Sequence, residues 1–471
     1  MEDNKIHFGY ENWRGLSGKE INFKRIARVA QAFADFLISH SNEKDVLKVA
    51  VGYDGRDKSK EFALLFSRIL SGNNILVFLS DKISSSPALV CFVKENNLNS
   101  GIIITGGRFP FEYNGIKFIS STGGILSKSQ LNEIEDFIDK DLIQVDEEKI
   151  YQTDIRTKHY EKLEGLVDFN SIKESGITFL IDSMGGAGQQ ILENLLIIND
   201  IKSKTIFKLA ESNFSGRNPN PLNRNLHEII SEIKQSENFS FGIATDGDAD
   251  RVVFVSDTGD LLNDNQTALL LADYLINIKK ESGDIIKSFI LTEKINKFKL
   301  DNQFSEVPVG LRFFSDHLNN KKTLVGFEGN GSFIWGNNSP YRDGILSALI
   351  FAEMIANSGY KKLSDYLDSK RELLNDIYTG ELVADHFKNN ILNTLCENPP
   401  DKIGKYTLKN IKSYKESNEE LNSLKFFFEG EKKWFVIRKS DHYPVLKLYA
   451  EGDSEKDVQE ILSAGYDLLR E

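Results

Sequence analysis

The sequence predicts three similar α/β domains with mixed sheets, followed by a smaller C-terminal α+β domain. Two observations carry this prediction. Apolar runs typical of strands alternate with amphipathic runs typical of helices, and this alternation restarts twice along the chain. From residue 434 onward the pattern changes to two strands and a terminal helix. Strands that alternate with helices favour mostly parallel sheets with helices on their faces.

The first round of alternation gives a βαβαβ pattern. Its strand-like and helix-like runs are, in order, residues 47–54, 58–72, 74–80, 87–97 and 100–107. The second round begins with a strand, a glycine turn and a helix at 176–199, and two strands joined by an acidic turn follow at 240–260. The third round has a helix at 263–280, strand-like runs and a helix at 342–359.

These rounds divide the chain into four expected domains. Residues 388–424 are polar, and we expect them to form a connector. The expected domains are residues 1–152, 153–260, 261–375 and 376–471.

Composition and charge argue against nucleic acid and membrane as the main partners. The 471 residues carry a formal net charge of −12, and the pI is about 5.3, which disfavours a polyanionic ligand. No apolar run reaches the ~18 residues of a membrane-spanning helix, and the first residues do not read as a signal peptide. Cys91 and Cys396 lie in apolar helical patterns, so we expect buried thiols in a reducing compartment.

The strongest chemical signal is the sequence DGDADR at residues 246–251. It places Asp246, Asp248 and Asp250 at alternate positions in a tight turn between two apolar strands. Three carboxylates so close together favour a hard divalent cation, and Mg²⁺ is the expected one. An EF-hand is excluded because the sixth position is Arg251 instead of glycine. The alternative is an acidic turn exposed to solvent, which the flanking apolar strands disfavour.

Three other loops give weaker signals. SMGGAGQQ at 183–190 lies at a strand-to-helix turn, but its glycine spacing is not that of a dinucleotide loop, and close packing of helix on strand is favoured. FEGNGS at 327–332 could hydrogen-bond sugar hydroxyls, although alone it is better explained as a turn. RKS at 438–440 could hold a phosphate, or it could be an exposed basic pair.

Taken together and in order, these segments resemble the α-D-phosphohexomutase superfamily, and they are most similar to its phosphoglucomutase/phosphomannomutase-like branch. DGDADR is identical to the metal loop of that family, and GYDGR (52–56) and PYRDGI (340–345) match two more of its motifs. The segments IHFGYENWRG, IDSMGGAG, RNPNP and GFEGNGSF resemble the family's FGTSGWRG, D-x-M-x-G-A-G, NPEP and GGEESGHI motifs. The resemblance covers essentially the whole chain.

The resemblance implies four domains around a central cleft and a cytoplasmic exchange of phosphoryl groups between C1 and C6 of a hexose phosphate. In such enzymes a phosphoserine in the motif TASHNP gives its phosphoryl group to the substrate. Mg²⁺, held by the three aspartates, neutralises charge in the transition state. The four domains would carry, in order, the phosphoserine loop, the metal loop, the sugar-binding loop and the phosphate-binding loop.

The loop that would carry the phosphoserine lacks its nucleophile. TGGRFP at 105–110 keeps the family's threonine and proline, but Gly107 stands at the serine position and Arg108 at the histidine position. Thr105 cannot replace the serine, because two strand residues place it about 6–7 Å away. The NGIK motif that follows, with Lys117, is intact, so the change is local.

The phosphate-binding loop has also changed. Arg438 and Ser440 remain, but Asp441 and His442 replace Gly-Thr, and Tyr443 replaces a glutamate. The carboxylate of Asp441 would repel a phosphate dianion at about 4 Å by roughly 1–4 kcal/mol per charge.

The sugar-binding loop and two further positions differ too. Glu328 remains in the sugar-binding loop, while Asn330 replaces a serine. Tyr10 and Glu11 replace a threonine and a serine in the opening motif. The resemblance places a basic residue near the reacting groups. This chain has a basic residue there too, Arg312, but arginine is a poorer general acid–base than lysine.

Two functions fit these changes. The first is a non-catalytic homologue that binds a phosphosugar or a protein partner, which explains why the substitutions cluster in reactive loops. The alternative is an active phosphoglucomutase or phosphomannomutase that uses Mg²⁺ and another phosphoryl carrier. That alternative keeps the metal loop, Arg14, Arg342, Asp343 and Arg438. Arg251 in the metal loop and Lys117 in NGIK are further candidate site residues.

A third hypothesis concerns Arg108. Its guanidinium could turn toward the aspartates and replace the charge of the metal, because arginine pairs well with carboxylates. Weak or absent Mg²⁺ binding would follow.

Overall fold

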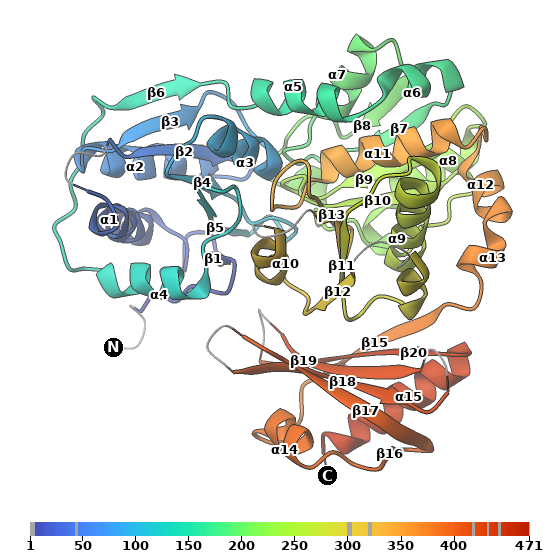
Figure 1. Ribbon diagram of the computed structural model, residues 1–471. Helices are drawn as coiled ribbons and strands as arrows, with labels where there is room; N and C mark the ends of the chain where they lie inside the picture. The colour runs from blue at the N-terminus through green and yellow to red at the C-terminus, as the bar shows by residue number, and fades with distance from the viewer. Residues whose placement is uncertain are drawn as a thin grey trace. The chain divides into compact units, whose positions relative to one another are not determined.

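The computed structural model describes residues 5–42, 46–298, 304–318, 323–416, 420–430, 433–440 and 444–470. These residues belong to two compact units, which are described separately. The first unit comprises residues 1–263, 315–321 and 330–369, and the second comprises residues 264–314, 322–329 and 370–471. The predicted fold class is confirmed, because three mixed or parallel sheets with helices precede a C-terminal antiparallel sheet (Figure 1).

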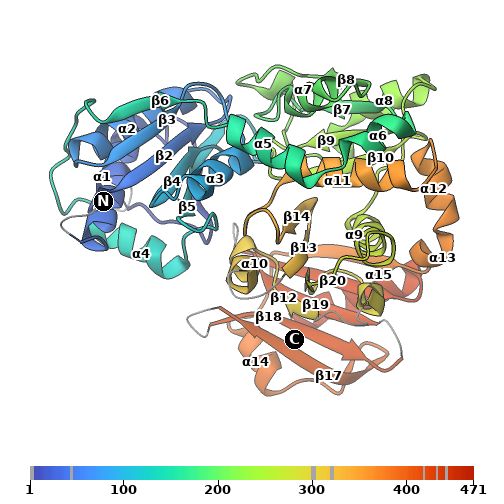
Figure 2. The same cartoon turned by 45° about the horizontal axis from the view of Figure 1, so that its top comes forward.

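The first sheet has six strands in the order β1-β5-β4-β2-β3-β6. Strands β4, β2, β3 and β6 run parallel, whereas β5 is antiparallel to β1 and β4. The predicted βαβαβ pattern is confirmed here, and Figure 2 shows β2, β3 and β6 side by side. The elements are β1 (Asn12–Leu16), α1 (Phe23–Ser39), β2 (Lys48–Tyr53), α2 (Ser59–Gly72), β3 (Leu76–Ser80), α3 (Ser86–Glu95), β4 (Ser100–Ile104), β5 (Tyr113–Ser120), α4 (Lys128–Phe137) and β6 (Ile150–Thr153).

Strand β4 is covered on both faces. Ile102 and Ile104 join a buried cluster with side chains of α1 and α2. Gly101, which precedes them and points to the opposite face, lies against α3, where an added side chain would meet Val93 at 2.6 Å. Glycine at 101 therefore allows α3 to pack closely, and the end of β4 is held firmly where the loop at 105–112 begins.

The second sheet has the order β10-β9-β7-β8. Strand β7 is parallel to β8 and β9, and β10 returns antiparallel to β9. The turn between β9 and β10 is the acidic motif at 246–251. The elements are α5 (Thr157–Leu166), α6 (Phe169–Ser175), β7 (Phe179–Asp182), α7 (Ile191–Ile198), β8 (Ser203–Ile206), the 3₁₀ turns η1 (Phe214–Gly216) and η2 (Asn223–Asn225), α8 (His227–Gln235), β9 (Phe241–Thr245) and β10 (Val252–Ser256).

The third sheet has the order β12-β11-β13-β14, with β11 parallel to β12 and β13. Helix α11 is buried along almost its whole length, as its apolar sequence requires. The elements are α9 (Asp264–Asp273), the π-helical segment η3 (Tyr274–Ile278), β11 (Asp284–Ser288), the 3₁₀ segment η4 (Glu293–Phe298), β12 (Phe304–Val307), α10 (Leu311–Leu318), β13 (Thr323–Gly329), β14 (Ser332–Trp335), α11 (Gly344–Asn357), α12 (Leu363–Ser369) and α13 (Arg371–Leu374).

The C-terminal sheet is antiparallel throughout, in the order β15-β20-β19-β18-β17-β16. Helices α14 and α15 pack on one face of it, as the red part of Figure 1 shows. The elements are β15 (Tyr378–Ala384), α14 (Ile391–Glu397), β16 (Lys402–Ile403), β17 (Tyr406–Lys415), β18 (Leu421–Phe428), β19 (Trp434–Lys439), β20 (Leu446–Gly452) and α15 (Glu455–Leu468).

The prediction that residues 388–424 form a connector is wrong. They include α14, β16, β17 and the start of β18. The sequence of β17, YTLKNIKSYK, hides a strand because much of it is exposed and its outward positions are lysine, asparagine and serine. Its ladder with β18, which sets Ile411 opposite Phe426, supplies the missing stabilisation, and local sequence does not reveal such pairing.

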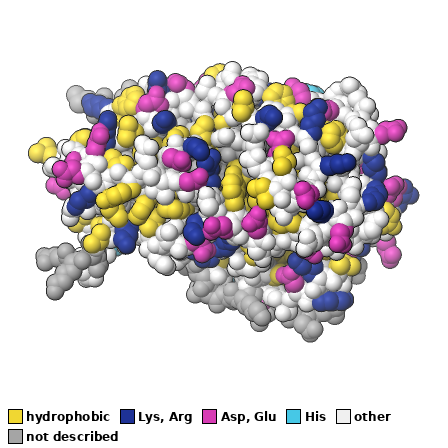
Figure 3. Space-filling model, turned by 90° about the horizontal axis from the view of Figure 1, so that it is seen from above, with side chains coloured by type: hydrophobic (Ala, Val, Ile, Leu, Met, Phe, Trp, Pro, Cys, Tyr) yellow, Lys and Arg dark blue, Asp and Glu magenta, His cyan; other side chains and the backbone are white. Residues whose placement is uncertain are grey.

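Expectations about cysteines and membrane segments can be compared directly with the structure. Cys91 is buried, Cys396 is half-buried, and both are free thiols. Burial raises the pKa of Cys91 to about 12, so its thiol stays protonated. No described helix has the length and apolar character needed to cross a membrane. On the face drawn in Figure 3, basic and acidic side chains are interspersed.

A buried network of opposite charges joins β11, β12 and β18 in the second unit. Lys425 Nζ lies 2.6 Å from Glu293 Oε1 and 2.8 Å from Glu306 Oε2. Lys287 Nζ lies 3.1 and 3.0 Å from the same two atoms. Burial alone would raise the pKa of Glu306, but Lys425 and Lys287 lower it well below its usual value. The network therefore depends on ionised carboxylates.

We expect Glu306→Gln to lower the free energy of unfolding by about 3–5 kcal/mol, because two buried ammonium groups then share one carboxylate. The lowered pKa of Glu306 stabilises the fold above its unfolded-state pKa of about 4.3, and this contribution is lost as pH falls toward the folded-state value. Urea unfolding of wild type and variant should therefore differ by a constant amount near neutral pH and converge in acid. Glu381→Gln, on exposed β15, is the control. A difference that grows in acid would contradict this account.

Candidate functional site

One buried guanidinium fixes the loop between β4 and β5. The Nε of Arg56 donates to Asp54 Oδ2 at 3.0 Å, which orients the group. Its two Nη atoms donate to four backbone carbonyls, those of Pro110 (2.7 Å), Tyr113 (2.9 Å), Gly107 (2.6 Å) and Phe109 (2.8 Å). The path of the loop backbone is thus fixed largely by a residue far away in the sequence.

The two glycines of the loop have different structural reasons. A side chain on Gly106 would meet Arg56 Cζ at 2.7 Å, so glycine lets the guanidinium lie against the backbone. Gly107 has φ +57°, and a Cβ built there would lie 3.5 Å from Asp248 Oδ1 and 3.7 Å from Arg14 Nη2. Position 107 therefore points at the acidic turn, in the direction that the family resemblance requires for a serine.

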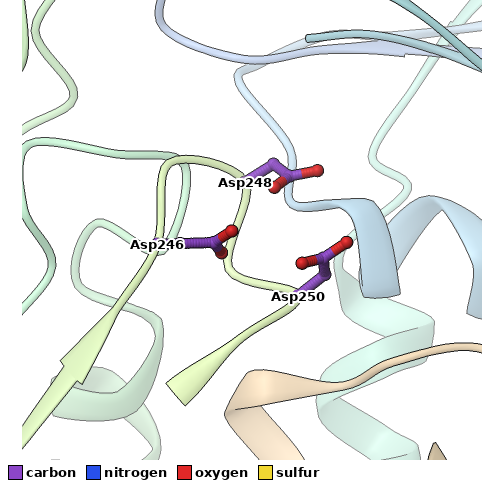
Figure 4. A group of neighbouring side chains, drawn as sticks. All are labelled: Asp246, Asp248 and Asp250. Carbon is purple, nitrogen blue, oxygen red and sulfur yellow. The ribbon is translucent and has the colours of Figure 1, made fainter. Parts of the chain in front are cut away.

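The acidic turn gathers three carboxylates in one space, and Figure 4 shows them projecting from one loop. Asp246, Asp248 and Asp250 each offer an oxygen that lies within 4.8 Å of the others. All three side chains are buried. The alternative of a solvent-exposed acidic turn does not fit this burial.

Two glycine- and proline-containing segments hold the turn in place. The amide of Gly247 donates to the carbonyl of Pro219 at 3.1 Å, and its carbonyl accepts from the amide of Ala187 at 2.9 Å. A side chain on Gly186 would meet the Gly247 oxygen at 2.9 Å. The SMGGAGQQ segment thus packs against the acidic turn, in addition to joining β7 to α7.

Lys117 lies among the aspartates. Its ammonium group donates to Asp248 Oδ2, to Asp250 Oδ2 at 2.8 Å and to the hydroxyl of Tyr341 at 3.2 Å. Ser86, the first residue of α3, donates its hydroxyl to the same oxygen of Asp248. The other oxygen, Asp248 Oδ1, is buried and has no hydrogen-bond partner among the described residues.

The charges in the turn are balanced by cations at different distances. Burial and the charges of Asp250 and Asp248 raise the pKa of Asp246 well above its usual value. Burial would also raise the pKa of Asp250, but Lys117 and nearby arginines lower it to about 2. Lys117 makes the close ion pairs, and the rest of the balancing charge comes from arginines that lie 3.8–4.0 Å from Asp246 and Asp250. The three carboxylates, with Asp248 Oδ1 unpartnered, fit a hard divalent cation that takes oxygen ligands.

Four arginines gather beside the acidic turn: Arg14 in β1, Arg108 in the loop at 105–112, Arg251 after the acidic motif and Arg342 before α11. Arg342 donates to both carboxylate oxygens of Glu11, at 3.1 and 3.2 Å. Arg251 Nε lies 4.0 Å from Asp246 and 3.8 Å from Asp250. The Nε of Arg14 is buried and has no hydrogen-bond partner in the described part of the chain.

The hypothesis that Arg108 pairs with the aspartates disagrees with the structure. Lys117 makes those ion pairs, and the Arg108 side chain forms no hydrogen bond or ion pair with any described residue. The charge of Arg251, then burial, then the charges of Arg14 and Arg342 lower the pKa of Arg108 to about 9. The charges of these arginines outweigh the opposing charge of Asp246. Lys117 in the NGIK strand makes the close ion pairs with the aspartates, and Arg108 does not.

The residues expected to bind sugar belong to different units. Glu328 is buried near the end of β13 in the second unit. Asn330, in the first unit, has φ +55°, and its carbonyl accepts from Arg251 Nη1 at 3.1 Å. The backbone of Asn330 is thus tied to the residue that follows the acidic triad.

The residues expected to bind phosphate lie at the end of β19 in the second unit. Arg438 is buried, and its Nε donates to the carbonyl of Lys439 at 3.1 Å. Alternation along β19 puts Arg438 on the same face as Trp434 and Val436, opposite α14. Ser440 follows the strand. Asp441, His442 and Tyr443 lie outside the described residues.

Two predicted site residues, Arg312 and Asp343, are held by other side chains or backbone groups of the fold. Arg312 Nε and Nη2 donate to the two carboxylate oxygens of Glu416 at 3.0 and 2.7 Å, so its planar group is held by a buried acid. Asp343 caps α11 by accepting from the amide of Leu346 at 2.9 Å, and it also lies 2.8 Å from His159 Nε2. These contacts give both residues a role in the fold.

Sequence reasoning did not single out Arg56, Ser86 or Tyr341. Arg56 lies in GYDGR, which was matched as a motif without a role, and its carbonyl partners are more than 50 residues away. Ser86 precedes a proline at a helix start, and Tyr341 lies within PYRDGI, so each had a local signal. Only the fold brings the hydroxyl groups of Ser86 and Tyr341 to the acidic turn.

Family models match most of the chain. The model described as phosphoglucomutase/phosphomannomutase, alpha/beta/alpha domain I, matches residues 5–144. The corresponding models for domains II and III match residues 157–259 and 263–373.

Relatives match over nearly the full length. A phosphoglucomutase/phosphomannomutase of Thermococcus kodakarensis is 26% identical, with 98% of each chain covered. A phosphoglucosamine/phosphogalactosamine mutase of Sulfurisphaera tokodaii is 24% identical, with 97% of each covered. Among solved structures, a Thermus thermophilus protein assigned to the phosphomannomutases has a TM-score of 0.83 at 25% identity, with 99% of each chain covered. The Aspergillus fumigatus N-acetylphosphoglucosamine mutase complex with GlcNAc-6P and magnesium shares the fold, with a TM-score of 0.57 at 12% identity and 94% and 99% coverage.

We expect Arg56→Gln to lower the free energy of unfolding by about 3–5 kcal/mol, because Asp54 is left buried without its cation and four carbonyls lose their donor. Arg28→Gln, which removes a pair with exposed Asp139, should cost less than about 1 kcal/mol. Urea denaturation measures both. Equal losses in the two variants would show that the loop does not depend on Arg56.

Proposed function

Because the chain belongs to the phosphoglucomutase/phosphomannomutase family of the α-D-phosphohexomutase superfamily, we propose that it binds a hexose phosphate and that the family's serine-dependent phosphoryl transfer is impaired in it. The observation that carries the proposal is position 107. Its Cβ direction points at Asp248 and Arg14, as a phosphoryl carrier would require, yet the residue is glycine. Without an oxygen at 107, no covalent phosphoryl carrier exists at that place.

Nearby hydroxyl groups are poorly suited to replace the serine. Thr105 Oγ1 donates to Asp54 at 2.7 Å and accepts from the amide of Gly107 at 2.9 Å, so it is committed to the loop. Ser86 is fully buried, and its hydroxyl donates to Asp248. Burial raises the pKa of Tyr341 above its usual value, which weakens it as a nucleophile. Each group supports the geometry of the site.

The proposal includes Mg²⁺. Asp246, Asp248 and Asp250 would hold the ion, and Lys117 would have to yield part of its contact with Asp248 and Asp250. When bound, the ion supplies positive charge for a phosphoryl group. Ser86 fixes the Asp248 oxygen that Lys117 also contacts.

The hexose phosphate would be read by residues that the resemblance assigns. Arg438 and Ser440 supply a cation and a hydroxyl for its phosphate, and Glu328 and Asn330 supply groups for its hydroxyls. The names of the full-length relatives all refer to sugar phosphates, which supports this ligand class. The proposed location is the cytoplasm, as the resemblance implies. Nucleic acid is not part of the proposal, in keeping with the net charge of −12.

The second candidate is an active mutase that passes phosphoryl groups between bound molecules. The kept acidic turn favours it, because Asp246, Asp248 and Asp250 could hold the metal ion that assists such a transfer. A protein partner that reads the phosphosugar-bound state belongs to the first candidate, as a regulator or scaffold.

A coupled mutase assay tests the proposal. With glucose 1-phosphate or mannose 1-phosphate and added 1,6-bisphosphate, we expect turnover roughly three orders of magnitude or more below that of the Thermococcus relative assayed in parallel, because the covalent carrier is missing. Calorimetry should still detect binding of the sugar phosphate. Turnover near that of the relative would overturn the proposal.

Gly107→Ser alone should not restore the full rate. The serine would have to adopt φ +57°, which costs about 1–2 kcal/mol for a residue with a side chain, and Arg108 and Asp441 would remain. The same coupled assay measures it, with Gly107→Ala as the control for backbone strain. Full recovery in the serine variant would mean that the other loops are competent.

Titration with Mg²⁺ tests the metal site. Asp248→Asn should abolish calorimetrically detected binding, because it removes one of three carboxylate ligands. Lys117→Met should tighten binding by about tenfold, equivalent to ~1.4 kcal/mol, because the competing ammonium is gone. Weaker binding in the Lys117 variant would contradict the competition described above.

A further inference from the structure

The charges around position 107 do not balance. Apart from the paired Arg56 and Asp54, five cationic side chains lie around this space: Arg14, Arg108, Arg251, Arg342 and Lys117. Four carboxylates oppose them: Asp246, Asp248, Asp250 and Glu11. A divalent cation at the acidic turn would add to the positive surplus. Like charges at close range destabilise a fold unless an anion joins them.

Two of the arginines have side-chain donors that no described residue accepts. Arg14 keeps a buried Nε without a partner, and its guanidinium lies 4.1 Å over the ring of Phe109, which holds its plane in place. Arg108 is half-buried and has no hydrogen bond or ion pair with any described residue. Arg251 and Arg342, in contrast, reach carboxylates.

We propose that a phosphate dianion binds noncovalently at position 107, held by Arg14 and Arg108 in the space that a serine side chain would occupy. A Cβ built at Gly107 would make ordinary contacts with Asp248 Oδ1, Arg14 Nη2 at 3.7 Å and Lys117 Cε, so these polar side chains border the point where a serine side chain would begin. Guanidinium groups suit this ligand because their planar donors bind two phosphate oxygens at once. Asp248 Oδ1, 3.5 Å from the same point, would share a metal ion with the phosphate instead of repelling it.

Arg108 is the residue that makes the site different. A glycine at 107 removes the covalent attachment, and an arginine at 108 adds a donor set and a permanent charge. The simpler explanation, that the arginines serve only to neutralise the acidic turn, does not account for Arg108, because Lys117 makes the close ion pairs there. The phosphate can be inorganic phosphate or the phosphoryl group of a sugar bisphosphate, which share this chemistry.

This inference extends the proposed function to a second ligand. It rests on the proposed function only for the expectation that a hexose phosphate binds nearby. The test is isothermal titration calorimetry of the full chain in Mg²⁺, first with inorganic phosphate and separately with glucose 1-phosphate and glucose 1,6-bisphosphate. We expect one phosphate per chain whose binding depends on Arg108. Arg108→Gln should weaken phosphate binding by about tenfold or more, because a charge-assisted contact is lost. Arg108→Lys should fall between the two, and Arg224→Gln, at an exposed arginine of the same unit, should bind like wild type.

Thermal melting confirms that each variant is folded before titration. Undetectable binding of millimolar inorganic phosphate to wild type, or equal affinity in wild type and Arg108→Gln, would overturn the inference. If glucose 1-phosphate still binds in those cases, the inference fails and the proposed function stands; if no sugar phosphate binds either, both fail. Displacement of bound inorganic phosphate by the bisphosphate, with the same dependence on Arg108, would identify the bisphosphate as the second source.

Discussion

The contact of the Arg56 guanidinium with the backbone from Gly107 to Tyr113 is the constraint on which the site depends. Because its two Nη atoms donate to four carbonyl oxygens, most of the loop's anchoring does not involve the side chains at 107–109. Gly107 therefore still points at the acidic turn. A loop held by its side chains would have rearranged when those changed. The backbone tether explains how reactive residues can be replaced here while the geometry of the site persists.

The acidic turn depends on the loop in return. The carbonyl of Gly107 packs against Gly247, the neighbour of two of the three aspartates, and Lys117 on β5 reaches the same carboxylates. Separate segments thus share one centre of charge, in which the buried carboxylates depend on cations from another segment of the chain. This mutual dependence makes the site hard to dismantle piecewise. It also means that an ion entering it shifts the balance of every group, which is why metal and phosphate binding should be coupled.

Sequence pattern predicted the features that depend on neighbouring residues. The strand and helix alternation located the three α/β sheets, and DGDADR located the turn whose three carboxylates lie together. Partners distant in the sequence were not predictable from it. The aspartates pair with Lys117 and not with Arg108, because the register of β5 with β4 and β1 decides which side chain reaches them. Strand β17 was missed for a related reason, since its stability comes from pairing with β18 and not from its own apolar content.

A site of this kind separates binding from turnover. Under the proposed function, arginines, a metal-binding turn and a sugar-reading loop would stabilise a phosphosugar in its ground state without a nucleophile. Catalysis needs interactions that exist only in the transition state, and the family resemblance implies a serine oxygen on the loop that carries the phosphoryl group between two transfers. A chain without that oxygen would keep ground-state binding. The same change removes the covalent phosphoryl group whose charge the arginines would have faced, so a mobile phosphate becomes the natural counterion. The remaining cations, more than the missing serine, would therefore determine which anion the loop binds.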